Sequence, residues 1–349
     1  DCMKIAIVGA GAIGGYLGAC LAATGEHQVS ALARGATLDA LRSHGWRVQE
    51  AKDGPRARAG ARWQAPLAAA SDHAAELGRQ DAVVIAVKSQ ALPGLAPNLQ
   101  PMIGPETLIV PAMNGVPWWF CQQVPGWQGR TLSAVDPDGG ISKALPAEQV
   151  LGCVVHMACS SPEPGLVLHR MGQGLIVGEA SGSISPRAEG FAACLQRAGL
   201  DTTLSPKVRQ DIWYKLWGNM TMNPVSALTG ATLEQMLQDP LVRQFCTAAM
   251  QEASEVGGRI GCPIGQSPED RHALTQKLGA VKTSMLQDVE AGRSIELDAI
   301  VGAVREIAQV LGVPTPHIDI LLGLTRLMAS NRGLYPQSYP RLESAASSA

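Results

Sequence analysis

The stretch that decides the fold opens the chain and reads Met3-Lys4-Ile5-Ala6-Ile7-Val8-Gly9-Ala10-Gly11-Ala12-Ile13-Gly14. Its first half is a short run rich in β-branched residues, which predicts a buried strand. Its second half is a G-x-G-x-x-G turn, and residues 15–23 continue as a helix. In such a turn the first glycine allows the tight bend, the second lets the backbone approach a pyrophosphate, and the third lets helix and strand pack closely. Glycines alone are weak evidence, but this order of strand, turn and helix predicts a Rossmann-type α/β domain that binds its cofactor at residues 9–14.

The second predicted strand, residues 28–33, indicates which dinucleotide is bound. NAD-binding domains usually place an acid about 20 residues beyond the glycines, where it holds the ribose diol. Here that neighbourhood holds Ala33 and Arg34, so no carboxylate repels a 2′-phosphate and a guanidinium is available to pair with one. The pattern therefore favours NADP, or NADPH in its reduced form, over NAD. The alternative is that Arg34 is a solvated loop residue.

Two more polar residues follow predicted strands of the same domain. Lys88 comes after the strand predicted over residues 81–87, and Asn114 after the strand over residues 107–111. Ligands of open α/β sheets lie at the carboxyl ends of strands, so both are candidates for cofactor contacts. Each has an ordinary alternative, Lys88 as a lysine in water and Asn114 as half of an Asn-Gly turn.

Composition narrows the class of protein. The 349 residues are enough for two domains, and 46% hydrophobic with 17% charged residues is typical of a globular enzyme. The net charge of -2 and the lack of a basic run argue against nucleic acid or an anionic membrane as a partner. No apolar run approaches the roughly 20 residues of a membrane span.

The distribution of cysteine and histidine indicates the compartment and the chemistry. The eight cysteines are scattered without C-x-x-C, and the seven histidines form no cluster with metal-ligand spacing. We therefore expect a reduced, cytoplasmic protein without a metal, and no signal peptide.

The pattern of elements changes twice along the chain. Strands and helices alternate to about residue 135, and from Gly152 three short strands read as a mostly antiparallel extension to the sheet. A helix over 186–199 and a strand over 201–204 would complete a first domain over residues 3–205. After Pro206 an all-helical domain is predicted over residues 206–335, followed by a flexible tail over 336–349. The candidate helices of the all-helical domain are 208–229, 240–260, 268–290, 294–311 and 316–331.

The helix predicted over 208–229 carries an unusual polar row. Lys215, Asn219 and Asn223 are spaced i, i+4, i+8, which stacks them along one face in an otherwise apolar setting. Asparagine is a poor residue for a helix interior, so two of them beside a lysine suggest a site for a polar substrate and a proton donor. The alternative is that Lys215 is a solvated lysine paired with Asp211, four residues before it.

Two further stretches of the helical domain stand out, Ser284-Met285-Leu286-Gln287-Asp288 and Ser294-Ile295-Glu296-Leu297-Asp298. Ser294 is a plausible N-cap, which would place Glu296 in the first turn of a helix, where the helix dipole stabilises an acid. Taken alone, Glu296 has this structural reading, and Ser284 is an ordinary helix serine.

Together these features resemble the ketopantoate reductases (2-dehydropantoate 2-reductases), over nearly the whole chain from Lys4 to about Met328. The helical motifs are much more specific than the glycine turn. The stretches that carry the resemblance are Gly9-Ala10-Gly11-Ala12-Ile13-Gly14, Arg34, Lys88, Asn114-Gly115, Pro164-Gly165-x-Val167-x-His169, Trp213-x-Lys215-Leu216-x-x-Asn219-x-x-x-Asn223-Pro224, Ser284-Met285-Leu286-Gln287-Asp288 and Glu296-x-Asp298.

The resemblance implies reduction of 2-dehydropantoate to pantoate with NADPH, on the route to pantothenate. It implies that Lys215 is the general acid and that Glu296 is a second catalytic residue, near the nicotinamide ribose and the substrate. The implied substrate ligands are Asn219, Asn223 and Ser284. The implied cofactor contacts are Arg34, Lys88, Asn114 and, by position only, Ala158.

The sequence departs from the family in two places. Many members have Asn-Gly after the Glu-x-Asp segment, whereas this chain has Val301-Gly302. Asn114-Gly115 also leads into three adjacent aromatics, Trp118, Trp119 and Phe120. We expect these aromatics to pack in a core. If they instead line the pocket mouth, the substrate need not be ketopantoate.

Two competing functions remain from the sequence. One is a related NADP-dependent hydroxyacid or opine-type dehydrogenase with another small substrate. The other is a non-catalytic protein that senses NADPH, which would have no need for the polar groups on its helices. The resemblance also leaves a homodimer open.

Overall fold

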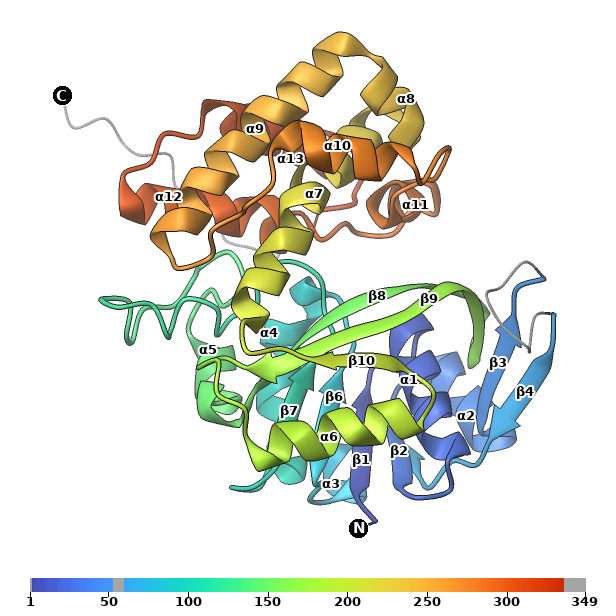
Figure 1. Ribbon diagram of the computed structural model, residues 1–349. Coiled ribbons are helices and arrows are strands. Elements are labelled where there is room, and N and C mark those ends of the chain that lie inside the picture. The colour runs from blue at the N-terminus through green and yellow to red at the C-terminus, as the bar shows by residue number, and fades with distance from the viewer. Residues whose placement is uncertain (1, 53–59, 336–349) are drawn as a thin grey trace. The chain divides into compact units, whose positions relative to one another are not determined.

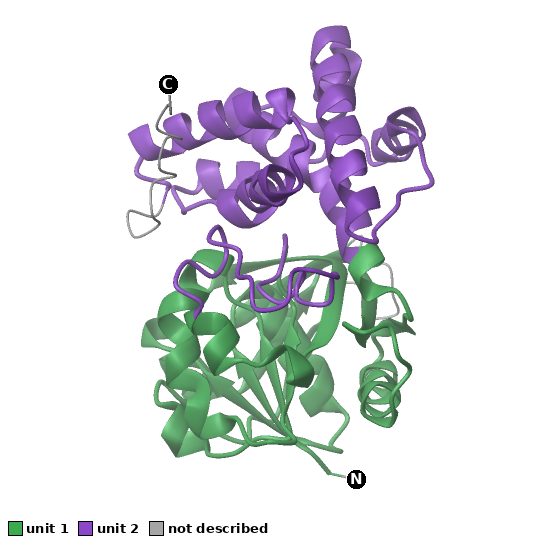
Figure 2. Cartoon of the chain, turned by 90° about the vertical axis from the view of Figure 1, so that its left-hand side faces the viewer, with its two compact units in different colours: residues 1–114, 140–211 green, residues 115–139, 212–349 purple. Residues whose placement is uncertain are grey.

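The computed structural model describes residues 2–52 and 60–335, which form two compact units (Figure 2). The first unit comprises residues 1–114 and 140–211, and the second comprises 115–139 and 212–349. Residues 115–139 therefore belong with the helical unit, although the predicted boundary places them in the first domain. The tail predicted over residues 336–349 lies outside the described residues.

A parallel sheet of five strands forms the centre of the first unit (Figure 1). The order is β5-β2-β1-β6-β7, so the chain leaves the central strand first to one side and then to the other. That is the strand order of a Rossmann-type domain, and the predicted fold class is confirmed. The strands are β1 (Lys4–Val8), β2 (Gln28–Leu32), β5 (Ala70–Ser71), β6 (Ala82–Ile85) and β7 (Leu108–Pro111).

The predicted extension to this sheet is instead a second sheet with mixed pairing. Strand β9 pairs antiparallel with β8 but parallel with β3 and β10, and β3 pairs antiparallel with β4. The two strands expected over 166–169 and 174–178 are one continuous strand. The strands are β3 (Trp46–Glu50), β4 (Arg62–Ala65), β8 (Leu151–Glu163), β9 (Leu166–Glu179) and β10 (Asp201–Leu204).

Helix α1 (Ala12–Ala23) packs against strands of both sheets. It approaches the second sheet closely because Gly15 and Gly18 lack side chains. A Cβ at Gly15 would meet Val167, and one at Gly18 would meet the buried ring of Trp46. The other helical segments of this unit are α2 (Gly35–His44), α3 (Ala74–Leu77), η1 (Ser89–Ala91), α4 (Leu92–Leu95), η2 (Ala96–Met102), α5 (Gly140–Ala144), η3 (Ala147–Gln149) and α6 (Pro186–Arg197).

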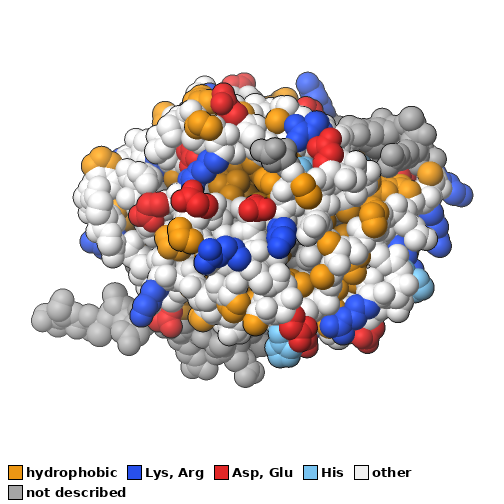
Figure 3. Space-filling model, turned by 90° about the horizontal axis from the view of Figure 1, so that it is seen from below, with side chains coloured by type: hydrophobic (Ala, Val, Ile, Leu, Met, Phe, Trp, Pro, Cys, Tyr) orange, Lys and Arg blue, Asp and Glu red, His pale blue; other side chains and the backbone are white. Residues whose placement is uncertain are grey.

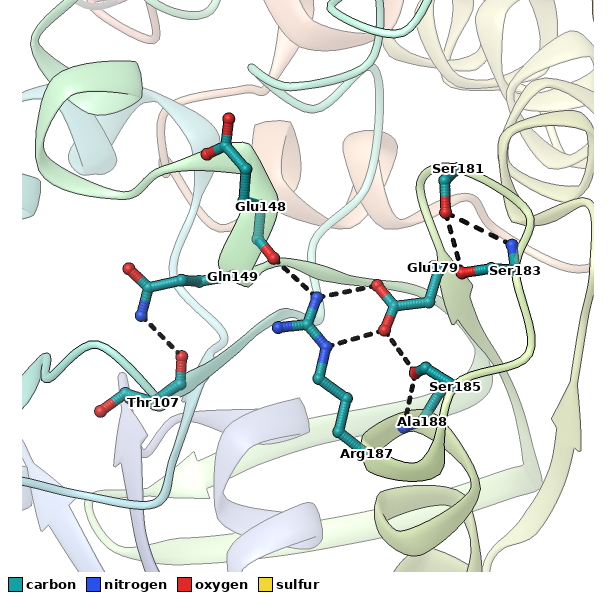
Figure 4. A network of polar contacts seen from close by, with 9 residues as sticks. All are labelled: Thr107, Glu148, Gln149, Glu179, Ser181, Ser183, Ser185, Arg187 and Ala188. Atoms are coloured by element: carbon teal, nitrogen blue, oxygen red, sulfur yellow. Dashed lines mark hydrogen bonds and ion pairs between the residues drawn. The ribbon is translucent and has the colours of Figure 1, made fainter.

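A polar network fastens α6 to the second sheet (Figure 4). The guanidinium of Arg187 binds both carboxylate oxygens of the buried Glu179, at 2.7 and 2.9 Å, and also donates to the Glu148 carbonyl. Ser185 caps the helix and donates to the same carboxylate at 2.6 Å. Burial alone would raise the pKa of Glu179, but the hydrogen bonds from Arg187 and Ser185 outweigh it and hold that pKa below its usual range.

In the second unit, the described residues from 212 onward are mainly helical, whereas residues 115–139 form turns and contain no helix. The helix predicted over 268–290 is wrong, because it divides into α10 and α11. Between them Gly279 adopts a φ of +73°, and the Val281 carbonyl accepts a hydrogen bond from Leu233, so residues 277–283 pair with α8 instead of continuing a helix. The helices are α7 (Val208–Thr229), α8 (Leu233–Gln238), α9 (Pro240–Arg259), α10 (Pro268–Gln276), α11 (Ser284–Glu290), the π-helix η4 (Asp298–Gly302), α12 (Ala303–Leu311) and α13 (Pro316–Asn331).

The surface in Figure 3 carries basic and acidic side chains interspersed, without a broad area of one sign. Within residues 2–52 and 60–335, no helix combines the length and hydrophobicity needed to cross a bilayer.

Candidate active site

The glycine turn has the geometry of a phosphate-binding loop. Gly9 follows β1 at a φ of +85°, and a Cβ at Gly14 would overlap the Gly9 carbonyl, which confirms the predicted tight turn and close packing. Gly11 is the N-cap of α1, and a Cβ there would meet no atom within 4 Å. No side chain caps this helix start and no acid lies in its first turn. The free backbone N–H groups and the helix dipole therefore suit a pyrophosphate.

Arg34, Lys88 and Asn114 follow the carboxyl ends of β2, β6 and β7. Because these strands run parallel to β1, the three residues and the glycine turn lie along the same edge of the sheet. Arg34 is exposed and is the N-cap residue of α2, while Lys88 and Asn114 are half-buried. The described groups at this edge fit a dinucleotide with an anionic diphosphate, which is the cofactor that the sequence predicts.

Ala158, assigned to the cofactor only by position, lies on β8 of the second sheet. It pairs with Met171 on β9 at a point where the strand register shifts on both sides. The shift marks a β-bulge, a feature that re-aims residues at functional sites. Ala158 is half-buried there.

The second unit holds the polar row on α7. Residues 208–229 form one continuous helix, which confirms that Lys215, Asn219 and Asn223 share a face. Lys215 and Asn219 are half-buried, and Asn223 is 6% exposed. Another face of α7 is fixed to α9, because the indole N–H groups of Trp213 and Trp217 donate to the Ala253 and Met250 carbonyls at 3.2 and 2.7 Å.

A chain of hydroxyl groups joins α7 to the start of α11. Ser226 donates to the Asn223 carbonyl at 2.8 Å and lies 2.6 Å from the Thr283 hydroxyl. Because the Ser226 hydroxyl donates its proton to the Asn223 carbonyl, the Thr283 hydroxyl is the donor in the hydrogen bond between Thr283 and Ser226. Thr283 is also the N-cap of α11, accepting from Leu286 N–H at 3.1 Å. The link brings the start of α11, where Ser284 is exposed, to the end of the polar row.

The sequence patterns did not indicate Ser226 or Thr283, although Thr283 stands where a helix N-cap is expected.

Asp211, the alternative partner of Lys215, accepts a hydrogen bond from the Ser205 hydroxyl at 2.5 Å. That contact gives the Asp211 carboxylate a structural role at the start of α7.

Glu296 lies just before the π-helix η4 and is half-buried. The prediction that Ser294 caps a helix with Glu296 in its first turn is wrong. The N–H of Ile295 donates to the carbonyl of Leu334, which follows α13, at 2.9 Å, and the π-helix begins only at Asp298. The π-helix that follows is a rare element that is frequently found at functional sites.

The segment after Asn114 packs on this π-helix. Val116 N–H donates to the Ala299 carbonyl at 2.8 Å, and Gly115, at a φ of +83°, leaves no room for a Cβ against Ala299. Glu306 on α12 secures the same segment by accepting the N–H groups of Ser133 and Ala134 at 2.7 and 2.9 Å. Burial raises the pKa of Glu306.

The three aromatics after Val116 lie in the core of the second unit, as expected. Trp118, Trp119 and Phe120 are at most 3% exposed. The Phe120 ring stacks on Trp213 of α7, with ring centroids 5.8 Å apart. The aromatics therefore support the helix that carries the polar row.

The candidate residues divide between the units. All the proposed cofactor contacts except Glu296 belong to the first unit. Lys215, Asn219, Asn223, Ser284 and Glu296 belong to the second. That the two sets form one site stays a prediction.

The parallel sheet has this strand order, and its first strand leads through a glycine turn into an uncapped helix. These two features define the class of Rossmann-type dinucleotide-binding proteins. Comparison with known proteins identifies the family. Residues 5–182 match the family described as ketopantoate reductase PanE/ApbA, and residues 207–329 match its C-terminal domain. The chain therefore belongs to the ketopantoate reductase family, as its motifs predict, and is a pyridine-nucleotide oxidoreductase.

Individual relatives agree over almost the whole length. A 2-dehydropantoate 2-reductase of Mesorhizobium japonicum is 42% identical over 334 residues, which cover 95% of this chain and 100% of that protein. A solved structure from Ralstonia solanacearum, assigned provisionally as a ketopantoate reductase, is 54% identical with a TM-score of 0.89, covering 95% of this chain and 99% of the other. The 2-dehydropantoate 2-reductase of Methylococcus capsulatus is 27% identical with a TM-score of 0.79, covering 94% and 97%.

Proposed function

We propose that this protein reduces a 2-oxo acid to the 2-hydroxy acid with NADPH, and that the substrate is 2-dehydropantoate and the product pantoate, a precursor of pantothenate. The observation that carries the proposal is the row of Lys215, Asn219 and Asn223 on one face of α7. One cation and two amides match a ketone and a carboxylate, and the two relatives named as 2-dehydropantoate 2-reductases support this substrate.

The residues of the row have the chemistry that the reaction needs. When bound, NADPH supplies a hydride to the carbonyl carbon of the substrate. Negative charge then grows on the carbonyl oxygen, where the ammonium of Lys215 stabilises it and donates a proton from Nζ. The amides of Asn219 and Asn223 both donate and accept, as the carbonyl, hydroxyl and carboxylate groups of the substrate require.

Ser284 and Glu296 complete the proposed site. The exposed hydroxyl of Ser284 is available to the substrate carboxylate at the start of α11. Glu296 would accept hydrogen bonds from the nicotinamide ribose or from a substrate hydroxyl. Preference for NADPH over NADH would come from Arg34, whose exposed guanidinium can pair with the 2′-phosphate.

A second candidate is a related NADP-dependent hydroxyacid or opine-type dehydrogenase. It is favoured by Val301, which is fully buried in η4 where many family members have asparagine. A site without that amide has one hydrogen-bonding group fewer for a polar substrate.

The two candidates are separated by a substrate panel. Oxidation of NADPH is followed by its loss of absorbance with ketopantoate, with smaller and larger 2-oxo acids, and with each acid plus an amine. We expect ketopantoate to give the highest kcat/KM and the amine to have no effect. Activity that requires the amine, or a larger acid that outperforms ketopantoate, would replace the proposed substrate. NADH in a parallel series tests the cofactor.

A further inference from the structure

The end of α13 folds back onto the segment that carries Glu296. Gly333 lies just beyond the helix at a φ of +69°, and the N–H groups of Gly333 and Leu334 donate to the Ser330 and Ala329 carbonyls at 3.2 and 2.7 Å. This is the Schellman pattern, which ends a helix and reverses the chain. The residue after the glycine, Leu334, is 5% exposed, so its burial anchors the reversed chain.

The reversed chain binds on both sides of Glu296. Before it, Ile295 N–H donates to the Leu334 carbonyl at 2.9 Å. After it, the Tyr335 hydroxyl lies 2.8 Å from each carboxylate oxygen of Asp298, the first residue of η4. Ile295 and Leu297 point their side chains into the core, with exposures of 1% and 0%. Glu296 is therefore the half-buried residue of a segment fixed at both ends.

Retaining a carboxylate at residue 298 has an energetic cost. Burial raises the pKa of Asp298 to about 6, although the hydrogen bond from Tyr335 opposes this shift. A buried acid with a raised pKa and one specific hydrogen-bond partner is a candidate for a functional role. The absence of a side chain at Gly302 makes room for this carboxylate, because a Cβ at residue 302 would lie 3.2 Å from Asp298 Oδ1.

We propose that Leu334 and Tyr335 form a C-terminal strap, and that Tyr335 is a positioning residue that sets Glu296 for the reaction by holding Asp298. The inference rests on the proposed function, because it assumes that Glu296 takes part in catalysis. It adds Tyr335 and Asp298, neither of which contacts the substrate in this account.

The test is a double-mutant cycle of Tyr335→Phe with Glu296→Gln, using the best substrate of the panel. Tyr335→Phe removes only the hydroxyl. Where the whole free energy of a hydrogen bond to a charged group is lost, the measured constant changes by about 10- to 100-fold. We expect kcat/KM to fall roughly 5- to 50-fold in the otherwise unaltered protein and less than about two-fold in the Glu296→Gln background. A role confined to folding stability would give the same factor in both backgrounds.

Two further variants make the test specific. Asp298→Asn keeps an acceptor for Tyr335 but removes its charge, so it should cost less kcat/KM than Tyr335→Phe, whereas Asp298→Ala should match Tyr335→Phe. Thr315→Val is the matched control. It also removes a hydroxyl from a carboxylate, that of Asp319 at 2.8 Å, and should change kcat/KM by less than about two-fold.

Each outcome decides the proposal. Equal losses in the two backgrounds, or a Tyr335→Phe variant as active as the unaltered protein, would overturn the strap while leaving the proposed function intact. A fully active Glu296→Gln variant would overturn the catalytic role of Glu296, and the strap would fall with it.

Discussion

At the scale of single residues, Arg34 determines the expected choice of cofactor. It stands at the end of β2 without an acid beside it, so its guanidinium is free to meet a 2′-phosphate. We expect Arg34→Ala to weaken NADPH binding by about 10- to 100-fold, the usual worth of a charge-assisted contact, and to leave NADH binding nearly unchanged. Titration of each cofactor by fluorescence measures both dissociation constants.

Arg42 provides the control for this prediction. It lies on α2, near Arg34 in the sequence, and its guanidinium donates to the Ala70 carbonyl at 3.2 Å. Arg42→Ala should therefore affect NADPH and NADH alike. Equal losses for both cofactors on Arg34→Ala as well would show that Arg34 does not select NADPH.

Asn223 is expected to bind substrate in the ground state and the transition state alike. An interaction of that kind lowers KM without raising kcat. We therefore expect Asn223→Ala to raise KM for the 2-oxo acid by about 10-fold or more and to lower kcat by less than about three-fold. Steady-state kinetics measure the split, with the exposed Asn331 at the end of α13 replaced by alanine as control. A fall in kcat with unchanged KM would assign Asn223 to the chemical step instead.

The types of residue at the site could be predicted from the sequence, because amides in an apolar helix and a missing acid after β2 are local signals. The hydrogen bonds that hold the surrounding segments in place could not be predicted. The Ser226–Thr283 bond joins residues 57 positions apart, and the Asp298–Tyr335 bond joins residues 37 positions apart. No local pattern predicts such pairs.

At the scale of secondary-structure elements, the errors share one physical cause. The hydrophobic patterns of several elements are local, and these elements were predicted correctly: strands β1, β2, β6 and β7 and helices α7, α9 and α13. Strands β3 and β4 were missed because neither is a continuous apolar run: β3 reads Trp-Arg-Val-Gln-Glu, and β4 carries Arg62 and Gln64 among its four residues. The helix expected from residue 294 begins only at Asp298, and the Ile295 N–H before it binds Leu334, which is distant in sequence. In both cases tertiary contacts override local propensity.

The π-helix η4 gives a prediction about pH. The folded-state pKa of Asp298 is about 6, above its ordinary value of 3.8, so between these values the folded protein binds more protons than the unfolded chain. The contribution of Asp298 to the free energy of unfolding is thus complete below about pH 4 and is lost as pH rises through 6, by roughly 3 kcal/mol. Asp298→Asn should remove this part of the pH dependence.

Thermal unfolding at pH 5 and pH 7.5 measures the effect. The difference in melting temperature between the two pH values should be smaller for Asp298→Asn than for the unaltered protein. Glu234→Gln, at an exposed acid of α8, is the control and should leave the difference unchanged. An identical pH dependence for Asp298→Asn would show that the carboxylate ionises in the fold without cost.

At the scale of the whole molecule, the division into two units separates the tasks. The glycine turn and Arg34 belong to the first unit, and Lys215 belongs to the second. The sequence predicted this order of domains but not that residues 115–139 join the helical unit. Their attachment depends on long-range contacts, such as the stacking of Phe120 on Trp213 and the hydrogen bond from Ser133 N–H to Glu306. A prediction that divides the chain at a single residue cannot include such contacts.

Lys215 is proposed as the acid of an NADPH-dependent reductase, and this role is tested by comparing Lys215→Ala with Lys207→Ala, which replaces an exposed lysine just before α7. The measurement is the rate of hydride transfer in a single turnover, together with the dissociation constant of NADPH. Removing a positioned acid typically costs about 10²- to 10⁴-fold in rate. We expect a loss of that size for Lys215→Ala with NADPH binding within about two-fold of the unaltered protein, and no loss for Lys207→Ala. A folded Lys215→Ala protein that transfers hydride at nearly the normal rate would contradict this role.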